Sequence, residues 1–292
     1  MQIHKIDSVL RLYEPDEHAM PCPVVFDSPH SGAMYPADFD HVCPHKLLKQ
    51  AEDTAIDQLF MDAPKSGATL LAADFPRTYI DANRAVDDID PLLLDGPAPI
   101  PIKPTDRSSL GIGLVRRLCK PGVPMYAKPL SWDAVQRRIN GYYTPYHTTL
   151  SSILDRAHYN FGMVWHINCH SMPASTAPIV AGGRMADFVL GDHDGQSCDV
   201  GFTLSLQTYL QGLGYTVALN NPFKGVELTE RYSDPGKHRH SLQLEMNKSL
   251  YMMADEVEID PAKYAALQAS IRGLIGYVTA YARDMMVPMA AD

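Results

Sequence analysis

Residues 163–173 read MVWHINCHSMP and are the most informative stretch of this chain. The apolar residues at its start are typical of a buried strand. Polar side chains follow them, and a proline ends the stretch. Residues 24–32, VVFDSPHSG, follow the same order of apolar strand, His-Ser and breaker. Open α/β sheets build their sites at the carboxyl ends of their strands. Two strand ends that each present His-Ser predict one shared site, and a bound metal is the simplest reason for it.

The remaining sequence alternates predicted strands with predicted helices. Strands are expected at 9–13 (an edge), 24–27, 69–73, 77–81, 163–168, 187–190, 216–218 and 241–246. Helices are expected at 45–64 with a break near 52–54, at 131–158 with a kink or break at Pro145, at 199–213 and at 261–283. Residues 1–20 are expected to be a mostly irregular lead-in, and residues 87–125 a long surface excursion of the kind that often forms a lid or a binding segment. The pattern predicts a single α/β domain over residues 1–292, a three-layer sandwich with a mixed, mostly parallel sheet between helices.

Composition and charge exclude several classes of protein. A net charge of −9 argues against a nucleic-acid partner. The five cysteines form no CxxC pair and are odd in number, which argues against a disulfide framework or a cysteine zinc site. No signal-peptide pattern and no run of 18 apolar residues occurs, so we expect a cytoplasmic protein without membrane contact.

Histidine and carboxylate side chains are therefore the candidate metal ligands. A catalytic zinc site uses three protein ligands and keeps a fourth position open for water. His30 and His170 supply two ligands, and Glu52 and Asp53, which interrupt an apolar helical pattern, are the candidates for the third. Taken alone, His30 fits a core or capping histidine equally well, and the spacing of Asp53 fits an acid on a helix surface. His166 is expected to be a buried supporting group.

Arginines follow the predicted strand at 77–81. Arg77 and the pair Asn83-Arg84 match the flat fork of a carboxylate, so they predict an anion clamp for a small acidic substrate. A surface array of ion pairs with the neighbouring aspartates is the alternative. In residues 241–247, SLQLEMN, alternation puts Glu245 on a polar face at the end of a strand. Near a metal it is suited to take a proton from water, whereas an ordinary exposed strand acid is the alternative.

Five segments, in this order, resemble those of the N-formylglutamate amidohydrolase family, zinc hydrolases with a core similar to that of the zinc carboxypeptidases. The resemblance runs from about Val24 to Tyr251. It rests on residues 28–32 (SPHSG), 52–57 (EDTAID), 77–84 (RTYIDANR), 168–172 (NCHSM) and 242–247 (LQLEMN). One departure is Asn168, where the family often has aspartate beside the second histidine.

The resemblance implies a role for each candidate residue. Zn²⁺ would be held by His30, Asp53 and His170, with Glu52 as the fallback acid. Glu245 and Arg84 would be catalytic, and the substrate would be bound by Arg77, Asn83, Arg84 and Arg184.

The implied activity is hydrolysis of the amide of a small anionic N-acyl amino acid. In its sharpest form the substrate is N-formyl-L-glutamate, the products are formate and L-glutamate, and the setting is histidine degradation. Two alternatives stay open. One is a zinc deacylase or carboxypeptidase-like hydrolase of other specificity, and the other is a non-catalytic relative that binds carboxylates.

Overall fold

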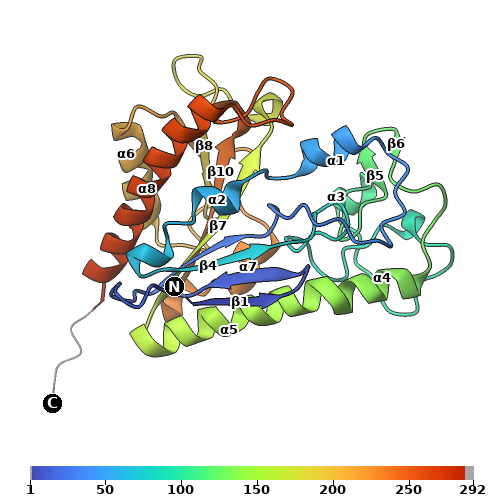
Figure 1. The fold of residues 1–292 in the computed structure, drawn as a ribbon, viewed down its shortest axis with the longest axis horizontal. Helices are drawn as coiled ribbons and strands as arrows, with labels where there is room; N and C mark the ends of the chain where they lie inside the picture. Colours follow the sequence, from blue (N-terminus) through green and yellow to red (C-terminus); the bar gives the residue numbers. More distant parts are fainter. Residues whose placement is uncertain (1, 287–292) are drawn as a thin grey trace.

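The computed structural model describes residues 2–286, in which an eight-stranded sheet has helices on both faces (Figure 1). The strand order is β1-β2-β4-β3-β7-β10-β8-β9. The bounds are β1 Ile3–Ile6, β2 Leu10–Tyr13, β3 Val24–Ser28, β4 Thr69–Ala73, β7 Val164–Met172, β8 Phe188–Gly191, β9 Val217–Leu219 and β10 Arg239–Asn247. A separate hairpin consists of β5 Leu118–Lys120 and β6 Val123–Pro124. Residue 1 and residues 287–292 of the predicted domain lie outside the described part of the chain.

The central strands β4, β3, β7 and β10 are mutually parallel. Antiparallel pairing occurs between β1 and β2, between β2 and β4, and between β10 and β8, whereas β9 is parallel to β8. Because the central strands run in one direction, their carboxyl ends meet at one edge of the sheet. The predicted α/β class with a mixed, mostly parallel sheet is confirmed.

Helices cover the two faces of the sheet and complete the three layers. One face carries α2 Ile56–Leu59, α6 Val200–Gly212 and α8 Pro261–Asp284, and the opposite face carries α5 Thr144–Phe161 (Figure 1). Successive side chains of β3 enter different layers, with Phe26 packed in the α8 layer and Val25 in the α5 layer. The remaining helices are α1 His45–Ala51, α3 Asp106–Ser109, α4 Trp132–Arg138 and α7 Glu227–Tyr232. Short 3₁₀ turns are η1 Pro64–Ser66, η2 Pro91–Leu93, η4 Ala174–Thr176, η5 Pro235–Lys237 and η6 Lys248–Leu250.

The helical segment predicted at 131–158 has the expected interruption. Ser131 caps α4 by accepting a hydrogen bond from the N–H of Ala134 at 3.3 Å. A π-helical turn, η3 Ile139–Tyr143, then leads into α5. Pro145 lies in the first turn of α5, directly after this π-helical turn. Gly162 ends α5 in the left-handed region with φ 72°.

Two predicted local structures are wrong. The predicted strand at 9–13 is present as β2, but residues 3–6 of the lead-in, predicted to be irregular, form a further strand, β1. This strand pairs antiparallel with β2 and takes the edge position that was expected for 9–13. Residues 77–81 form a turn and not a strand. The carbonyl of Pro76 accepts the N–H of Tyr79 at 2.9 Å, which bends the chain, and the N–H of Asp81 donates to Leu114 at 2.8 Å.

The predicted excursion at 87–125 does not stay on the surface. It contains η2, α3 and the β5–β6 hairpin, and its residues Leu114 and Val115 are fully buried. The five cysteines are free and buried. Among residues 2–286, no helix combines the length and apolarity needed to cross a membrane.

Candidate active site

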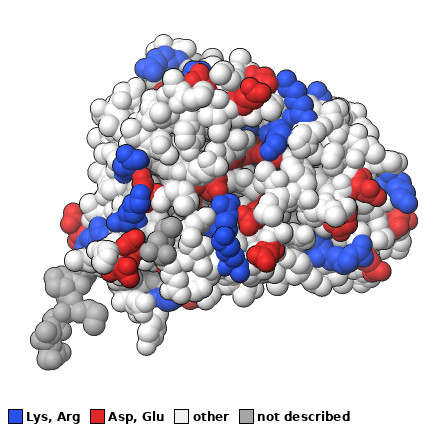
Figure 2. All heavy atoms as spheres, in the orientation of Figure 1, with Lys and Arg blue, Asp and Glu red and all other residues white. Residues whose placement is uncertain are grey.

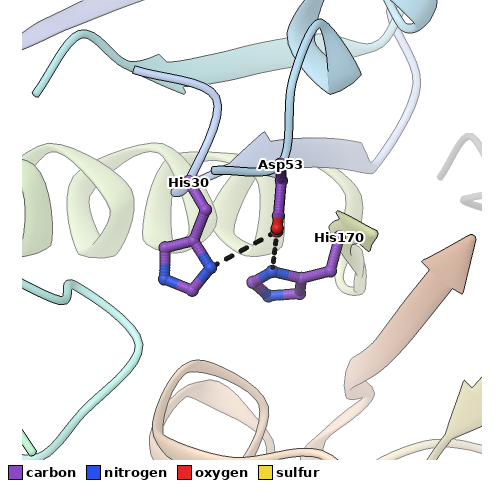
Figure 3. A group of neighbouring side chains, drawn as sticks. All are labelled: His30, Asp53 and His170. Atoms are coloured by element: carbon purple, nitrogen blue, oxygen red, sulfur yellow. Dashed lines mark hydrogen bonds and ion pairs between the residues drawn. The ribbon is translucent and has the colours of Figure 1, made fainter. Parts of the chain in front are cut away.

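His30, Asp53 and His170 converge at the carboxyl edge of the central strands (Figure 3). His30 follows β3, His170 lies in β7, and Asp53 lies in the break between α1 and α2. One possible ligand atom from each residue lies within 4.8 Å of the others. Asp53 Oδ2 is 2.9 Å from His170 Nδ1 and 3.4 Å from His30 Nδ1, and all three side chains are buried.

Local backbone geometry brings these side chains together. The N–H of Asp53 donates to the carbonyl of His30 at 3.1 Å, which ties the two loops. Ala55 has a φ of 59°, so the helical run breaks there and turns Asp53 inward. Gly32 passes directly against the end of β4, because a Cβ at this position would lie 2.3 Å from the carbonyl oxygen of Phe75.

Hydrogen bonds to the second ring nitrogen determine how each histidine faces the group. His30 Nε2 lies 2.6 Å from Asp81 Oδ1, and His170 Nε2 lies 2.6 Å from Asn168 Oδ1. The carboxylate of Asp81 only accepts hydrogen bonds, so Nε2 of His30 carries the proton. Nε2 of His170 also lies 3.0 Å from the amide nitrogen of Asn83, but its shorter contact, with the oxygen of Asn168, favours a proton on this nitrogen as well. Each Nδ1 therefore presents a lone pair toward Asp53.

The resulting set of atoms fits a divalent cation. Two imidazole lone pairs and a carboxylate oxygen converge with no donor between them, and His30 Nδ1 has no hydrogen-bond partner among the described residues. A buried acceptor without a partner is costly unless a ligand satisfies it. Imidazole and carboxylate are the ligands that Zn²⁺ takes in catalytic sites, and orientation of the histidines by an acidic or amide oxygen is usual there.

Glu52 lies outside this group. Its carboxylate accepts hydrogen bonds from the hydroxyl of Tyr35 and, at 2.9 Å, from Lys49. The break in the helix thus sends adjacent acids to different sides of the chain. Of the two candidates for the third ligand, the structure brings Asp53 to the histidines and not Glu52.

Glu245 lines the same cavity, which has a volume of about 250 Å³. It is paired with His170 in the register of β10 and β7, and it accepts a hydrogen bond from Gln243 at 2.9 Å. Burial raises the pKa of Glu245 to about 7, with the negative charge of Asp53 adding to the rise and the positive charges of His170 and Arg77 opposing it. A carboxyl with such a pKa exchanges protons readily near neutral pH.

Arg77, Asn83 and Arg84 also line this cavity. Arg77 donates to Asp81 at 2.9 Å and lies 3.7 Å from Asp53, so its charge is neutralised within the site. Although burial raises the pKa of Asp81, Arg77 and His30 hold it well below its ordinary value. The guanidinium of Arg84 donates to the carbonyls of Asn83 at 2.7 Å and Ile112 at 3.3 Å, and it has no carboxylate partner within residues 2–286.

The structure does not bring Arg184 to the cavity. Its side chain is 63% exposed and lies 3.7 Å from Asp187 in a turn. The turn holds it at the surface, because the N–H of Val180 donates to the carbonyl of Arg184 at 2.8 Å. The expectation that Arg184 lines the substrate pocket is corrected on this ground.

Two arginines of the cavity were missed by the sequence reasoning. Arg107 and Arg116 come from the excursion at 87–125 and line the cavity with Arg84. The signal available was basic residues inside a segment otherwise rich in proline and aspartate. On the face shown in Figure 2, basic and acidic side chains are interspersed.

The amino-acid sequence is similar to those of proteins with a named activity. The sequence profile of the N-formylglutamate amidohydrolase family matches residues 22–252. N-formylglutamate deformylase of Pseudomonas putida is 32% identical over 238 residues, which cover 80% of this chain and 83% of that protein. The deformylase of Pseudomonas aeruginosa is 30% identical over 267 residues, covering 90% and 94%.

A solved structure extends the similarity to three dimensions. The crystal structure of N-formylglutamate amidohydrolase from Ralstonia eutropha JMP134 superposes with a TM-score of 0.90 at 42% identity, and the match covers 95% of this chain and 99% of that one. The profile match spans β3 to β10 and includes all three members of the His-Asp-His group. This chain therefore belongs to the N-formylglutamate amidohydrolase family.

Proposed function

We propose that this protein hydrolyses N-formyl-L-glutamate to formate and L-glutamate, with Zn²⁺ held by His30, Asp53 and His170. Relatives named N-formylglutamate deformylase support the reaction. The observation that carries the proposal is the position of Glu245, a buried carboxylate with a raised pKa, in the same cavity as the three candidate ligands. The proposed substrate is a small anionic molecule, and our proposal includes a role in histidine degradation and a cytoplasmic location.

Glu245 is the proton carrier in this proposal. A bound divalent cation would lower the pKa of a water molecule and polarise the formyl carbonyl. As the oxygen of water adds to the formyl carbon, the Glu245 carboxylate accepts a proton from that water. When the C–N bond breaks, Glu245 returns the proton to the departing amine nitrogen, which leaves L-glutamate and formate. The pKa of about 7 favours both halves of this transfer near neutral pH.

Arg84 binds a carboxylate of the substrate. Its guanidinium is fixed by two backbone carbonyls and keeps further N–H groups for a ligand in the cavity. The side chain of Asn83 is already engaged, since its oxygen accepts the N–H of Leu228 at 3.0 Å and its nitrogen lies 3.3 Å from Asn168 Oδ1 and 3.0 Å from His170 Nε2. Asn83 therefore positions the clamp, and Arg77 supports the ligand group through Asp81 and Asp53.

The test is the variant Glu245→Gln, which keeps the size of the side chain and removes its basicity. We expect unchanged metal content and a kcat for N-formyl-L-glutamate reduced on the order of 10²–10⁴-fold. A normal rate in this variant would show that Glu245 is not the base.

Wild-type protein that binds metal and N-formyl-L-glutamate without releasing formate would support the non-catalytic alternative. A panel of N-formyl, N-acetyl and N-carbamoyl amino acids distinguishes the named substrate from other deacylase specificities.

A further inference from the structure

Arg116 is a buried cation without a partner. Its side chain lines the cavity, the residue is 9% exposed, and its Nε has no hydrogen-bond partner in the described part of the chain. No carboxylate within residues 2–286 forms an ion pair with it. Its sequence neighbour Arg117 is different, because Arg117 Nε lies 2.5 Å from Asp90 Oδ2 outside the cavity.

The backbone around Arg116 is held firmly. Leu114 and Val115 are fully buried, and Leu114 bonds through its carbonyl to Asp81 and through its N–H to Asp88, each at 2.8 Å. Arg84 reaches the carbonyl of Ile112 in the same segment. The backbone at 112–116 is therefore hydrogen-bonded to the segment at 81–88, which carries Arg84. This pairing fixes the backbone position of Arg116 before a ligand binds.

The charges that line the cavity do not balance. Arg77 is neutralised by Asp81, and Lys248 donates to the carbonyl of Gln50 at 2.7 Å. Arg84 and Arg116 keep their charges without a carboxylate partner within residues 2–286, and so does Arg107, which is exposed to solvent. Burial, and then the positive charges of Arg77 and Arg84, lower the pKa of Arg116 to about 9. A buried unpaired cation is costly, and an anion in the cavity would offset that cost.

We propose that Arg116 binds the side-chain carboxylate of the substrate and thereby selects acyl derivatives of acidic amino acids over neutral ones. This inference rests on the proposed function and adds a specificity-determining residue to it. Arg84 then receives the α-carboxylate, and the two guanidinium groups together match a dianion. Apolar neighbours in the cavity, Ile112 and Val226, suit the methylene groups between the two carboxylates.

The test compares two substrates that differ only at the side-chain end, N-formyl-L-glutamate and N-formyl-L-glutamine. In Arg116→Met we expect kcat/KM for the glutamate derivative to fall about 100-fold, mostly through KM, because a charge-assisted hydrogen bond is lost. The value for the glutamine derivative should change less than about threefold. Arg116→Lys should recover part of the loss. The matched control Arg117→Met, which removes an arginine outside the cavity, should keep the wild-type preference.

Binding measurements separate this proposal from the proposed function. Calorimetric titration with both compounds uses zinc-loaded Glu245→Gln protein, with and without Arg116→Met, because this background binds the compounds without consuming them. Tighter binding of the glutamate derivative by the Glu245→Gln protein, lost when Arg116→Met is added, supports the carboxylate subsite. Equal losses for both compounds in a folded Arg116→Met protein, or no loss for either, would overturn it. Absence of formate release by wild type would instead count against the proposed function alone.

Discussion

Asp27 Oδ1 accepts a hydrogen bond from the side-chain amide of Asn168 at 2.7 Å, and this bond decides how His170 faces the candidate metal site. With its nitrogen turned to Asp27, Asn168 presents its oxygen to His170 Nε2 at 2.6 Å. The ring proton then lies on Nε2, and Nδ1 is left as an acceptor facing Asp53. A fully buried carboxylate, Asp27, thus orients His170, a candidate metal ligand with which it shares no hydrogen bond within the described residues.

The first prediction concerns Asp27→Asn. The variant removes the charge that fixes the Asn168 amide, so His170 loses its defined orientation. We expect Zn²⁺ affinity to weaken about 10–100-fold, measured by competition with a chelator. Tyr146→Phe is the control, since it removes only the hydroxyl that donates to the other oxygen of Asp27 at 2.9 Å. If a folded Asp27→Asn protein bound Zn²⁺ as tightly as wild type, the Asp27–Asn168 bond would have no such role.

A pair of adjacent acids tests the third ligand. Asp53→Asn should lose most of its bound zinc, because Asp53 Oδ2 lies between the two histidines, whereas Glu52→Gln should keep it, because Glu52 is bonded to Tyr35 and Lys49. Zinc content after dialysis against a weak chelator, measured by elemental analysis, gives the result directly. The opposite pattern, with zinc lost only in Glu52→Gln, would exclude Asp53 as the ligand.

The pH dependence of the reaction follows from the raised pKa of Glu245. Only the ionised carboxylate accepts a proton, so kcat/KM should fall about tenfold per pH unit on the acid side of this pKa. The pKa is about 7 without a cation, and a nearby positive ion favours the ionised form, so the midpoint should lie between about 4.5 and 7. Zinc content must be constant over the range, since protonation of histidines also releases metal. The same acid limb in Glu245→Gln would show that another group titrates.

Local patterns were sufficient to predict most of the elements. The apolar runs at β3, β4 and β7 and the helical periods of α5, α6 and α8 depend on which side chains face the core, and this periodicity is written in neighbouring residues. Strand β1 has no such pattern because all four of its residues are exposed and it is held by pairing with β2. The segment at 77–81 has strand-like residues, but long-range bonds from Asp81 to Leu114 and His30 hold it as a turn.

The sequence by itself determined that His30, His170 and Glu245 follow or end buried strands, because alternation and apolar runs place polar residues at strand ends. Tertiary structure alone decided that Asp53 and not Glu52 meets the histidines, that Arg184 stays at the surface, and that Arg116 reaches the cavity. The physical reason is that each of these outcomes depends on backbone turns and hydrogen-bond partners distant in the chain, such as Asp27 for Asn168 and Asp81 for Leu114. Such partners leave no periodic trace in the neighbouring residues.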